Sequence, residues 1–277
     1  CIKQTPSRLE ENYRMKDSIT QNRIGKKIAQ GAVVAALWLL LWQAAAMAVG
    51  QELLLVSPLT MLRRLAQLVR QPVFWQAVFS SCGRIMAGVL LALAAGTVLA
   101  ALMSRFSFLY AFFRPALQVI KSTPVASFII LALVWIKSWA LGAFAAFLMV
   151  LPMVWANLYE GIAAVDRDLL EMAKAYRFSF GKKMRYLYLP SLLPYFAAAC
   201  STGIGIGWKA GIAAEVLGLP KNSIGKALYN AKIYLEMPDL FCWTAVIILL
   251  SLLFEKLAAR LLHALTARLA VEKEGQR

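Results

Sequence analysis

The chain has 277 residues, of which 61% are hydrophobic and only 16% are charged, and its formal net charge is +16. One soluble core does not need that much apolar surface, so the composition excludes an ordinary soluble protein and predicts helices that face lipid. The basic residues cluster beside the apolar segments, as they do in membrane proteins, which argues against a nucleic-acid partner.

The first quarter of the chain contains a polar tail and the first predicted span. Residues 1–27 are polar and basic and are predicted to form a cytoplasmic N-terminal tail. Residues 28–49 contain no charged residue and form a long apolar run. At about 1.5 Å per residue, this segment can cross a hydrocarbon core of about 30 Å, and it is predicted to be the first transmembrane helix. After Ser57 and Pro58, leucines at helical spacing in TMLRRLAQLVRQ predict a short amphipathic helix at the outer surface.

The second and third spans differ in regularity. Residues 85–103 form a continuous apolar segment, which predicts the second span. The next apolar segment, 108–136, carries Arg114 and Lys121 in its first half and Pro124 near its middle. Because proline lacks the amide donor and crowds the preceding turn, the third span is predicted to be a broken helix. The break is either an ordinary kink or a part of a transport pathway.

The rest of the chain supplies three more spans and two polar connections. The predicted segments are span four at 140–158, a cytoplasmic loop at 163–190, span five at 191–217, a polar segment at 218–239, span six at 240–253 or as far as 262, and a cytoplasmic C-terminal tail at 263–277. With six spans both termini lie on one side, and that side holds 20 of the 30 lysines and arginines. The termini and the 163–190 loop are therefore predicted to be cytoplasmic.

The cytoplasmic loop contains a helix-compatible segment with two distinct faces. A helix over 167–176 would place Leu169, Met172, Ala173 and Tyr176 on one side and charged residues, including Glu171, partly on another. Such a helix can dock in a protein groove, where Ala173 would allow close approach and Glu171 would accept hydrogen bonds or pair with a basic group. The alternative is an amphipathic helix that lies on lipid headgroups.

The spacing of Glu171, Met172 and Ala173, followed by a turn between Arg177 and Gly181, resembles the EAA loop of binding-protein-dependent ABC importer permeases. In that family the loop forms the coupling helix that docks on the ATPase. The family usually has a glycine where this chain has Arg177. Because arginine is strained at positive φ, the turn is expected either to shift to Gly181 or to be built differently.

The resemblance covers residues 57–262, which it implies are an ABC type I transmembrane domain, and it is closest to the nitrate, sulfonate and taurine branch. It implies an all-α, polytopic membrane protein with six transmembrane helices in the bacterial cell membrane. The implied function is that of a permease subunit for nitrate, a sulfonate, taurine or a vitamin-like compound. The implied partners are ABC ATPase subunits, a second permease copy that is expected to be identical, and an extracytoplasmic solute-binding protein. The chain itself is expected to bind no cofactor, with ATP and Mg²⁺ on the partner ATPase.

Span five carries small and charged residues on different faces. Gly203, Gly207 and Gly211 recur every four residues and predict a close helix contact. Glu215 continues this stripe, whereas helical geometry places Lys209 about 160° from Gly211. A charge within a span is costly unless it faces protein or water. Lys209 and Glu215 are therefore candidates either for the translocation pathway or for structural ion pairs or interfacial positions, and Lys209 favours an anionic solute.

No catalytic or metal-binding pattern is found in the sequence. His263 is the only histidine, and the segment 218–226 lacks the spacing of a phosphate-binding loop. The four cysteines have no metal-ligand spacing. An enzyme is therefore not expected. The alternatives are a stand-alone secondary transporter, against which the lack of repeated halves argues, and a structural scaffold, against which the family loop argues.

Overall fold

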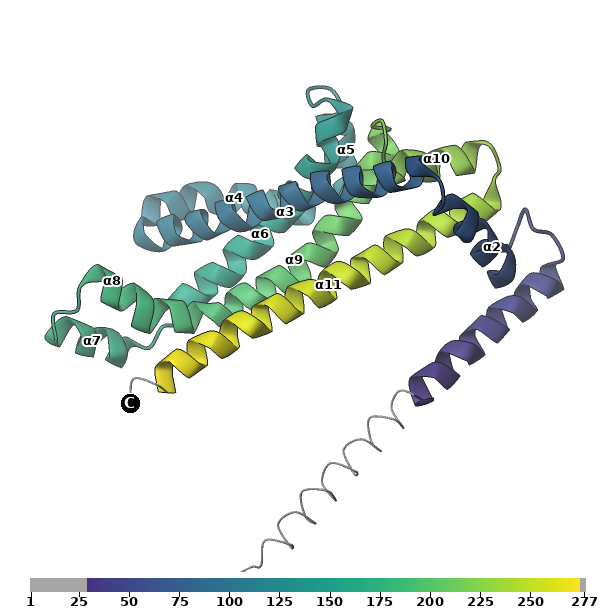
Figure 1. The fold of residues 1–277 in the computed structure, drawn as a ribbon. Helices are drawn as coiled ribbons and strands as arrows, with labels where there is room; N and C mark the ends of the chain where they lie inside the picture. Colours follow the sequence, from purple (N-terminus) through teal and green to yellow (C-terminus); the bar gives the residue numbers. More distant parts are fainter. Residues whose placement is uncertain (1–28, 275–277) are drawn as a thin grey trace, which may run out of the picture. The chain divides into compact units, whose positions relative to one another are not determined.

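The structure is a computed structural model that describes residues 29–274, except for the side chains of 263 and 265–274. The helices are Ala29–Val49, α2 (Pro58–Leu68), α3 (Pro72–Arg105), α4 (Ser107–Ser122), α5 (Val125–Ala132), α6 (Ser138–Ala163), α7 (Arg167–Ala175), α8 (Phe180–Lys183), a π-helical turn at Met184–Tyr188, α9 (Leu189–Gly218), α10 (Ile224–Ile233) and α11 (Met237–Glu274) (Figure 1). The predicted tail at 1–27 lies outside the described residues. The predicted all-α architecture is confirmed for the described range.

The chain divides into two compact units, residues 1–64 and residues 65–277. In the first unit, the helix Ala29–Val49 is apolar and long enough to span a membrane. The start of α2 follows the predicted Ser57 and Pro58 signal. The Ser57 hydroxyl oxygen accepts a hydrogen bond from the backbone N–H of Thr60 at 3.2 Å. This contact caps a donor that the first helical turn would otherwise leave unpaired.

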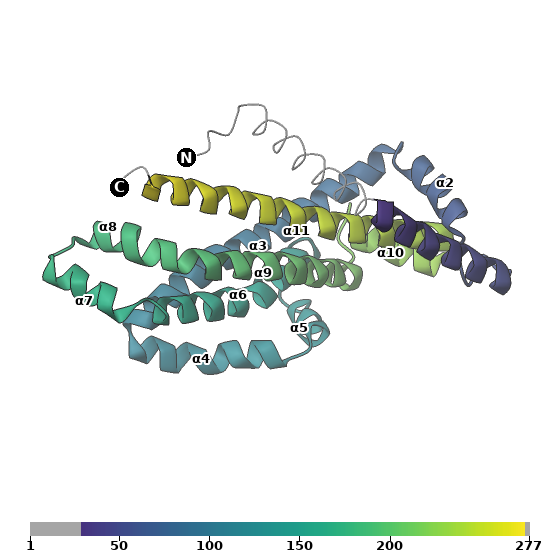
Figure 2. The same cartoon turned by 90° about the horizontal axis from the view of Figure 1, so that it is seen from below.

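The second unit is built around four long helices, α3, α6, α9 and α11. In both views α6 and α9 lie side by side, with α11 along the other side of α9 and α4 along the other side of α6 (Figures 1 and 2). One buried cluster joins three elements near the end of this group: Ile129 and Ala132 of α5, Leu141 and Ala145 of α6, and Ala214 of α9. In a lipid environment such helix contacts depend mainly on van der Waals packing, which favours small side chains where the helices meet.

Glycines allow α3 to approach α6 closely. A Cβ atom on Gly88 would clash with the backbone of Ala143, and one on Gly96 would lie 2.8 Å from the Val154 side chain. Neither position leaves room for a larger residue unless one of the two helices moves. The absence of a side chain at these two positions is therefore a condition of the α3 to α6 contact.

The third predicted span is broken, as the sequence predicts. The axes of α4 and α5 differ by 105°, and the two helices together are long and apolar enough to count as one span. The last bond of α4 runs from the Thr123 N–H to the Val119 carbonyl, and α5 begins with a bond from the Ser127 N–H to the Pro124 carbonyl. Pro124 has no N–H to continue the first ladder, so the helix ends before it and restarts after it. With the five unbroken candidate spans, the described part of the chain contains up to six.

Several boundaries differ from the predicted ones. Helix α3 begins at Pro72 rather than near residue 85, so Arg84 lies within the helix and does not mark its border. Helix α11 continues to Glu274, through most of the predicted C-terminal tail. The segment 218–239, predicted only as polar, contains α10. Ser223 caps this helix, because its hydroxyl oxygen accepts a 3.1 Å hydrogen bond from the Lys226 N–H. Charges in these regions were poor indicators of helix ends because helices tolerate charges that find partners or water.

Candidate functional site

Helix α7 forms the centre of the predicted cytoplasmic loop. Its N-cap is Asp166, whose carboxylate accepts a hydrogen bond from the backbone N–H of Asp168 at 2.9 Å. The negative charges of Asp166 and Asp168 also lie at the positive end of the helix dipole, where they are favourable. The predicted helix at 167–176 therefore forms with nearly the predicted bounds.

A left-handed residue at Arg177 ends α7. The Phe178 N–H donates to the Ala173 carbonyl and the Arg177 N–H donates to the Lys174 carbonyl, at 2.9 and 3.0 Å. These two bonds form a Schellman motif, which requires positive φ at the residue after the cap. Arg177 adopts φ +49°, whereas Gly181 does not have a positive φ and lies within α8. The turn has therefore not shifted to Gly181 but is built on arginine, at a cost of about 1 kcal/mol relative to glycine.

The loop exposes a mixed apolar and charged surface. Four large side chains are substantially exposed, namely Leu169, Met172, Tyr176 and Phe180, of which Tyr176 and Phe180 are 73% and 79% exposed. Glu171 is also exposed. In contrast, Ala173 is completely buried within the chain. Its small side chain therefore lies in the interior of the loop and not on the exposed surface, and its part in the approach of a partner stays a prediction.

The loop is joined to the membrane region without a break in helical structure. Helix α8, the π-helical turn and α9 form one helical segment from Phe180 to Gly218. Helix α8 ends at Lys183, the π-helical turn begins at Met184, and α9 begins at Leu189, with no residue between them. The end of the loop therefore continues directly into the helix that holds Gly203, Lys209 and Glu215.

The glycine stripe of α9 contacts α3 and α6. A Cβ on Gly207 would lie 2.7 Å from the Val89 side chain and 2.8 Å from that of Val150. At Gly211 the nearest atom would be Ile85 Cγ1, at 2.6 Å, and at Gly203 it would be Val150 Cγ1, at 3.0 Å. These distances show that the three glycines face the helix bundle and leave no space for added side chains.

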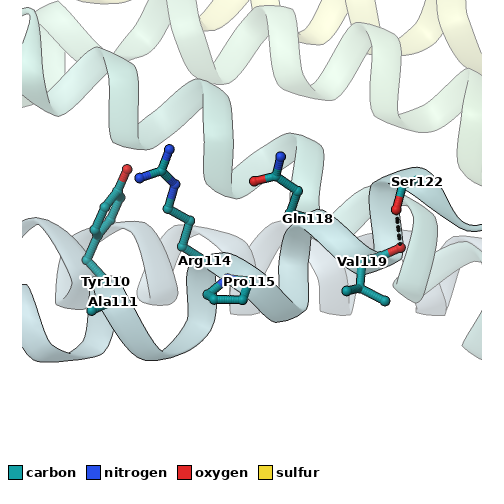
Figure 3. Close-up of a pocket in the computed structure, with 7 residues that line it drawn as sticks. All are labelled: Tyr110, Ala111, Arg114, Pro115, Gln118, Val119 and Ser122. Carbon is teal, nitrogen blue, oxygen red and sulfur yellow. Dashed lines mark hydrogen bonds between the residues drawn. The ribbon is translucent and has the colours of Figure 1, made fainter.

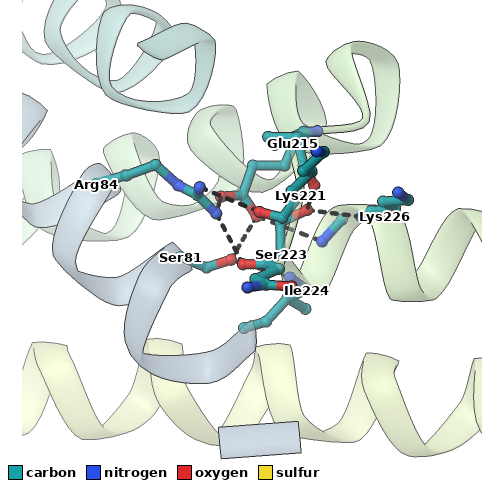
Figure 4. Close-up of polar contacts among 10 residues, drawn as sticks. Ser81, Arg84, Glu215, Lys221, Ser223, Ile224 and Lys226 are labelled. Carbon is teal, nitrogen blue, oxygen red and sulfur yellow. Dashed lines mark hydrogen bonds and ion pairs between the residues drawn. The ribbon is translucent and has the colours of Figure 1, made fainter. Parts of the chain in front are cut away.

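Glu215 is enclosed in a polar cluster between α3, α9 and α10 (Figure 4). Its side chain has no exposed surface. One carboxylate oxygen accepts from the Ser81 hydroxyl at 2.6 Å and from the Gly225 N–H at 3.3 Å, and the other pairs with Arg84 at 3.1 Å. The Ser81 oxygen in turn accepts from the Ile224 N–H at 2.9 Å. In this conformation Glu215 is a structural ion-pair residue and does not line an open pathway.

Arg84 extends this cluster to the segment between α9 and α10. Its guanidinium also donates to the carbonyl of Asn222 at 3.1 Å and to that of Lys221 at 3.4 Å. The sequence reasoning did not identify Arg84 and Ser81 as partners of Glu215. A usable signal was present, because Arg84 and Glu215 are charges of opposite sign within otherwise apolar helices, and such charges are expected to pair.

Lys209 and Pro124 remain apart from this cluster. Lys209 is exposed and lies on a different face of α9 from the glycine stripe, together with the exposed Ser201 and Thr202. Within the described residues it forms no ion pair. Pro124 is the N-cap of α5, at the bend after α4. Within the described residues, no hydrogen bond or ion pair joins Lys209 or Pro124 to the Glu215 cluster.

Two relatives illustrate what the chain is similar to. It is 25% identical over 201 residues to the nitrate import permease protein NrtB of Synechocystis sp., and the aligned region covers 69% of this chain and 72% of that protein. It is 28% identical over 161 residues to the bicarbonate transport system permease protein CmpB of the same organism, and the aligned region covers 57% of this chain and 56% of that protein.

A solved structure and a family model agree with these relatives. The crystal structure of an amino acid ABC transporter with histidines superposes with a TM-score of 0.59 and 19% identity, over 74% of this chain and 97% of that one, which supports the type I permease fold. The model of the binding-protein-dependent transport system inner membrane component matches residues 85–271. This match covers more than half of the chain, and the protein therefore belongs to that family of multi-pass ABC importer permeases.

Proposed function

We propose that this chain is the permease subunit of a bacterial ABC importer, forms the translocation pathway for a small solute, and couples transport to ATP hydrolysis by a separate ATPase. The observation that carries the proposal is the α7 surface, where exposed apolar side chains surround the exposed Glu171. Apolar side chains beside a charge are suited to a groove in a partner protein. The unbroken helical segment from Phe180 to Gly218 would transmit the movement of that partner to the membrane helices.

In the assembled importer, two copies of the permease would pair with two ATPase subunits and an extracytoplasmic solute-binding protein. ATP and Mg²⁺ would be held by the ATPases, and this chain would bind neither. The excess of lysine and arginine on one side supports a cytoplasmic location for the termini and the α7 loop. Closure of the ATPases on ATP would then alternate the accessibility of a path along the dimer axis.

The proposed solutes are nitrate, a sulfonate, taurine or a vitamin-like compound. Support comes from the relatives, whose names refer to nitrate and bicarbonate, and from Lys209, an exposed cation within α9. An exposed charge in a span must face water or protein, since contact with lipid is costly. We assign Lys209 to the pathway on this basis, propose the helix break at Pro124 as a second part of the pathway, and leave Glu215 out of it.

The variant Glu171→Lys tests the coupling. A reversed charge in the docked surface should cost a few kcal/mol of association with the ATPase, as truncated or repelled charge pairs commonly do. Co-purification of the ATPase with the permease, and substrate-stimulated ATP hydrolysis in lipid vesicles, should both fall sharply. Uptake by the wild-type complex should require ATP and should persist when ion gradients are collapsed, which distinguishes an ABC importer from a secondary transporter.

A matched control is Glu236→Lys, which reverses an exposed charge at the other end of the membrane helices. This variant should retain the ATPase. If Glu171→Lys keeps wild-type co-purification and stimulated hydrolysis, the α7 loop is not the coupling element and the proposal fails.

A further inference from the structure

Helix α4 has a polar face and an apolar face along its whole length. Its polar and charged side chains lie within an arc of about 120° by helical geometry. The residues on this arc are Ser107, Tyr110, Arg114, Gln118, Lys121 and Ser122. The opposite face is apolar and exposed, with Phe108 at 77% and Phe112 at 65%. One face of α4 is therefore suited to lipid, and the other is not.

The polar face of α4 lies within a candidate membrane span. Arg114 is about 10 Å and Lys121 about 21 Å along the helix from Ser107, at 1.5 Å per residue, whereas the hydrocarbon core is about 30 Å thick. Helices α4 and α5 together qualify as one membrane span, and α4 runs beside α6 (Figures 1 and 2). An arginine at this depth is expected to face protein or water and not lipid.

An open groove lies along this face, with a volume of about 600 Å³. Its lining comes from α4 alone: the polar residues Tyr110, Arg114, Gln118 and Ser122, and the apolar residues Ala111, Pro115 and Val119. Figure 3 shows the side chains of Tyr110, Arg114 and Gln118 directed to the same side of the helix. This volume is sufficient for a small solute with part of its hydration shell.

The groove presents a few hydrogen-bond donors among apolar side chains and lacks a counter-charge among the described residues. Arg114 lies over the Tyr110 ring, 5.4 Å from its centroid, and Tyr110 stacks on Tyr159 of α6 at 4.9 Å. Within the described part of the chain, no carboxylate forms an ion pair with Arg114. The ring contact orients the guanidinium but leaves its N–H groups available, because a cation over a ring face uses no lone pair.

A second cation on α4, Lys121, lies over a ring on α6 that carries an unpaired donor. The Lys121 ammonium lies 5.9 Å from the Trp155 ring centroid. Trp155 is 9% exposed, and its indole N–H is buried and has no acceptor among the described residues. Buried donors without acceptors are uncommon and call for an explanation. Lys121 therefore adds a second positive charge to the polar face of α4, which favours an anion over a cation there.

We propose that this α4 groove binds a small oxyanion and that Arg114 is its principal ligand, by bidentate hydrogen bonds from the guanidinium with Gln118 beside it. The inference rests on the proposed function and makes it more specific, since it places a binding position for an anionic solute on the transport path. Planar guanidinium groups match the spacing of two oxygens in nitrate, bicarbonate or a sulfonate. A lipid phosphate has the same chemistry, and the experiment must distinguish the two sources.

The test uses Ser122→Cys in a background where the native cysteines are replaced, because Ser122 lines the groove. The assembled transporter is reconstituted in phosphatidylcholine vesicles and treated with an anionic or a cationic methanethiosulfonate reagent. Electropositive clefts raise the local anion concentration roughly tenfold or more. Each reagent's rate is therefore divided by its rate on a free thiol, and the anionic reagent should then react about tenfold faster than the cationic one. Added Arg114→Gln should remove most of this preference, and Arg114→Lys should retain part of it. Lys137→Gln, which removes an exposed cation outside the groove, should leave it unchanged.

Sodium nitrate identifies the occupant. Nitrate should slow the modification at a concentration where sodium gluconate, at equal ionic strength, does not, and Arg114→Gln should abolish this protection. Three results would overturn the proposal: an equal response to both salts, a cysteine that is unreactive in the assembled transporter because a second copy covers the groove, or protection given by phosphatidylglycerol in the vesicles and not by nitrate. The last result would assign the groove to a lipid headgroup.

Transport measurements keep this inference separate from the proposed function. If wild-type vesicles take up nitrate with ATP and Arg114→Gln lowers that uptake at least tenfold while retaining the ATPase, both stand. If Arg114→Gln takes up nitrate at the wild-type rate, the groove assignment fails and the importer function stands. If the wild-type complex shows no ATP-dependent uptake of any solute, the proposed function itself fails.

Discussion

The carboxylate of Glu215 in α9 lies 3.1 Å from the guanidinium of Arg84 in α3. The two residues are 131 positions apart in the sequence, so the pair joins two distant helices. The same guanidinium reaches two carbonyls of the segment that follows α9. This pair therefore holds one end of the bundle together, and its contribution depends on both charges being present.

Removing one charge of this pair should destabilise the protein. Arg84→Gln leaves a carboxylate with no exposed surface without its cation, and breaking a buried pair in this way costs about 3–5 kcal/mol. The free energy of unfolding, measured by denaturation in mixed micelles, should fall by a large part of that amount. The double variant Arg84→Gln with Glu215→Gln should be more stable than Arg84→Gln alone, because it contains no isolated charge. If the double variant is the less stable one, the pair is not the source of the effect.

The contact of α9 with α3 and α6 should not accept a methyl group at Gly207. Gly207→Ala places a Cβ 2.7 Å from Val89 and 2.8 Å from Val150, and such overpacking typically costs about 1–3 kcal/mol. Gly207→Leu should prevent recovery of folded protein. Gly83→Ala is the matched control, since nothing lies within 4 Å of the added atom. Thermal unfolding in detergent measures both, and equal midpoints would show that the stripe is not a packing surface.

Glycine should be more favourable than arginine at the turn after α7. Arg177→Gly relieves a residue at φ +49° and should stabilise the turn by about 1 kcal/mol, which corresponds to about fivefold greater protection of the bonded amides. Hydrogen exchange at the Phe178 N–H, which donates to the Ala173 carbonyl, reports this change. Gly181→Ala should leave that protection unchanged, since Gly181 is helical and has open space around it. Reduced protection in Arg177→Gly would contradict the assigned turn.

The orientation of the chain can be tested by labelling from each side. Lys182→Cys in the α8 segment and Lys221→Cys between α9 and α10 lie at opposite ends of α9. In a background without the native cysteines, a membrane-impermeant maleimide should label only the position near α10 in intact cells. After the membrane is opened, both positions should react. Labelling of both positions in intact cells would overturn the predicted cytoplasmic location of the α7 loop.

The local pattern of the sequence predicted most of the architecture. Long apolar segments predicted the spans, Ser57 with Pro58 predicted the start of α2, and Pro124 predicted the break after α4. These features are properties of neighbouring residues, so hydropathy and backbone chemistry are sufficient to identify them. The start of α3 was missed because Arg84 was interpreted as the border of a span, and that interpretation ignores a distant partner.

The sequence by itself determined that the protein is a helical membrane protein with a short amphipathic helix in its 163–190 loop, because apolar length, helical periodicity and proline act locally. Only the tertiary structure decided that Glu215 is enclosed by Ser81 and Arg84, that Ala173 is interior, and that Lys209 is exposed on another face. The physical reason is that the partner of a charge is chosen by which helices pack together. That choice depends on contacts between residues far apart in the chain, which periodicity along one helix does not specify.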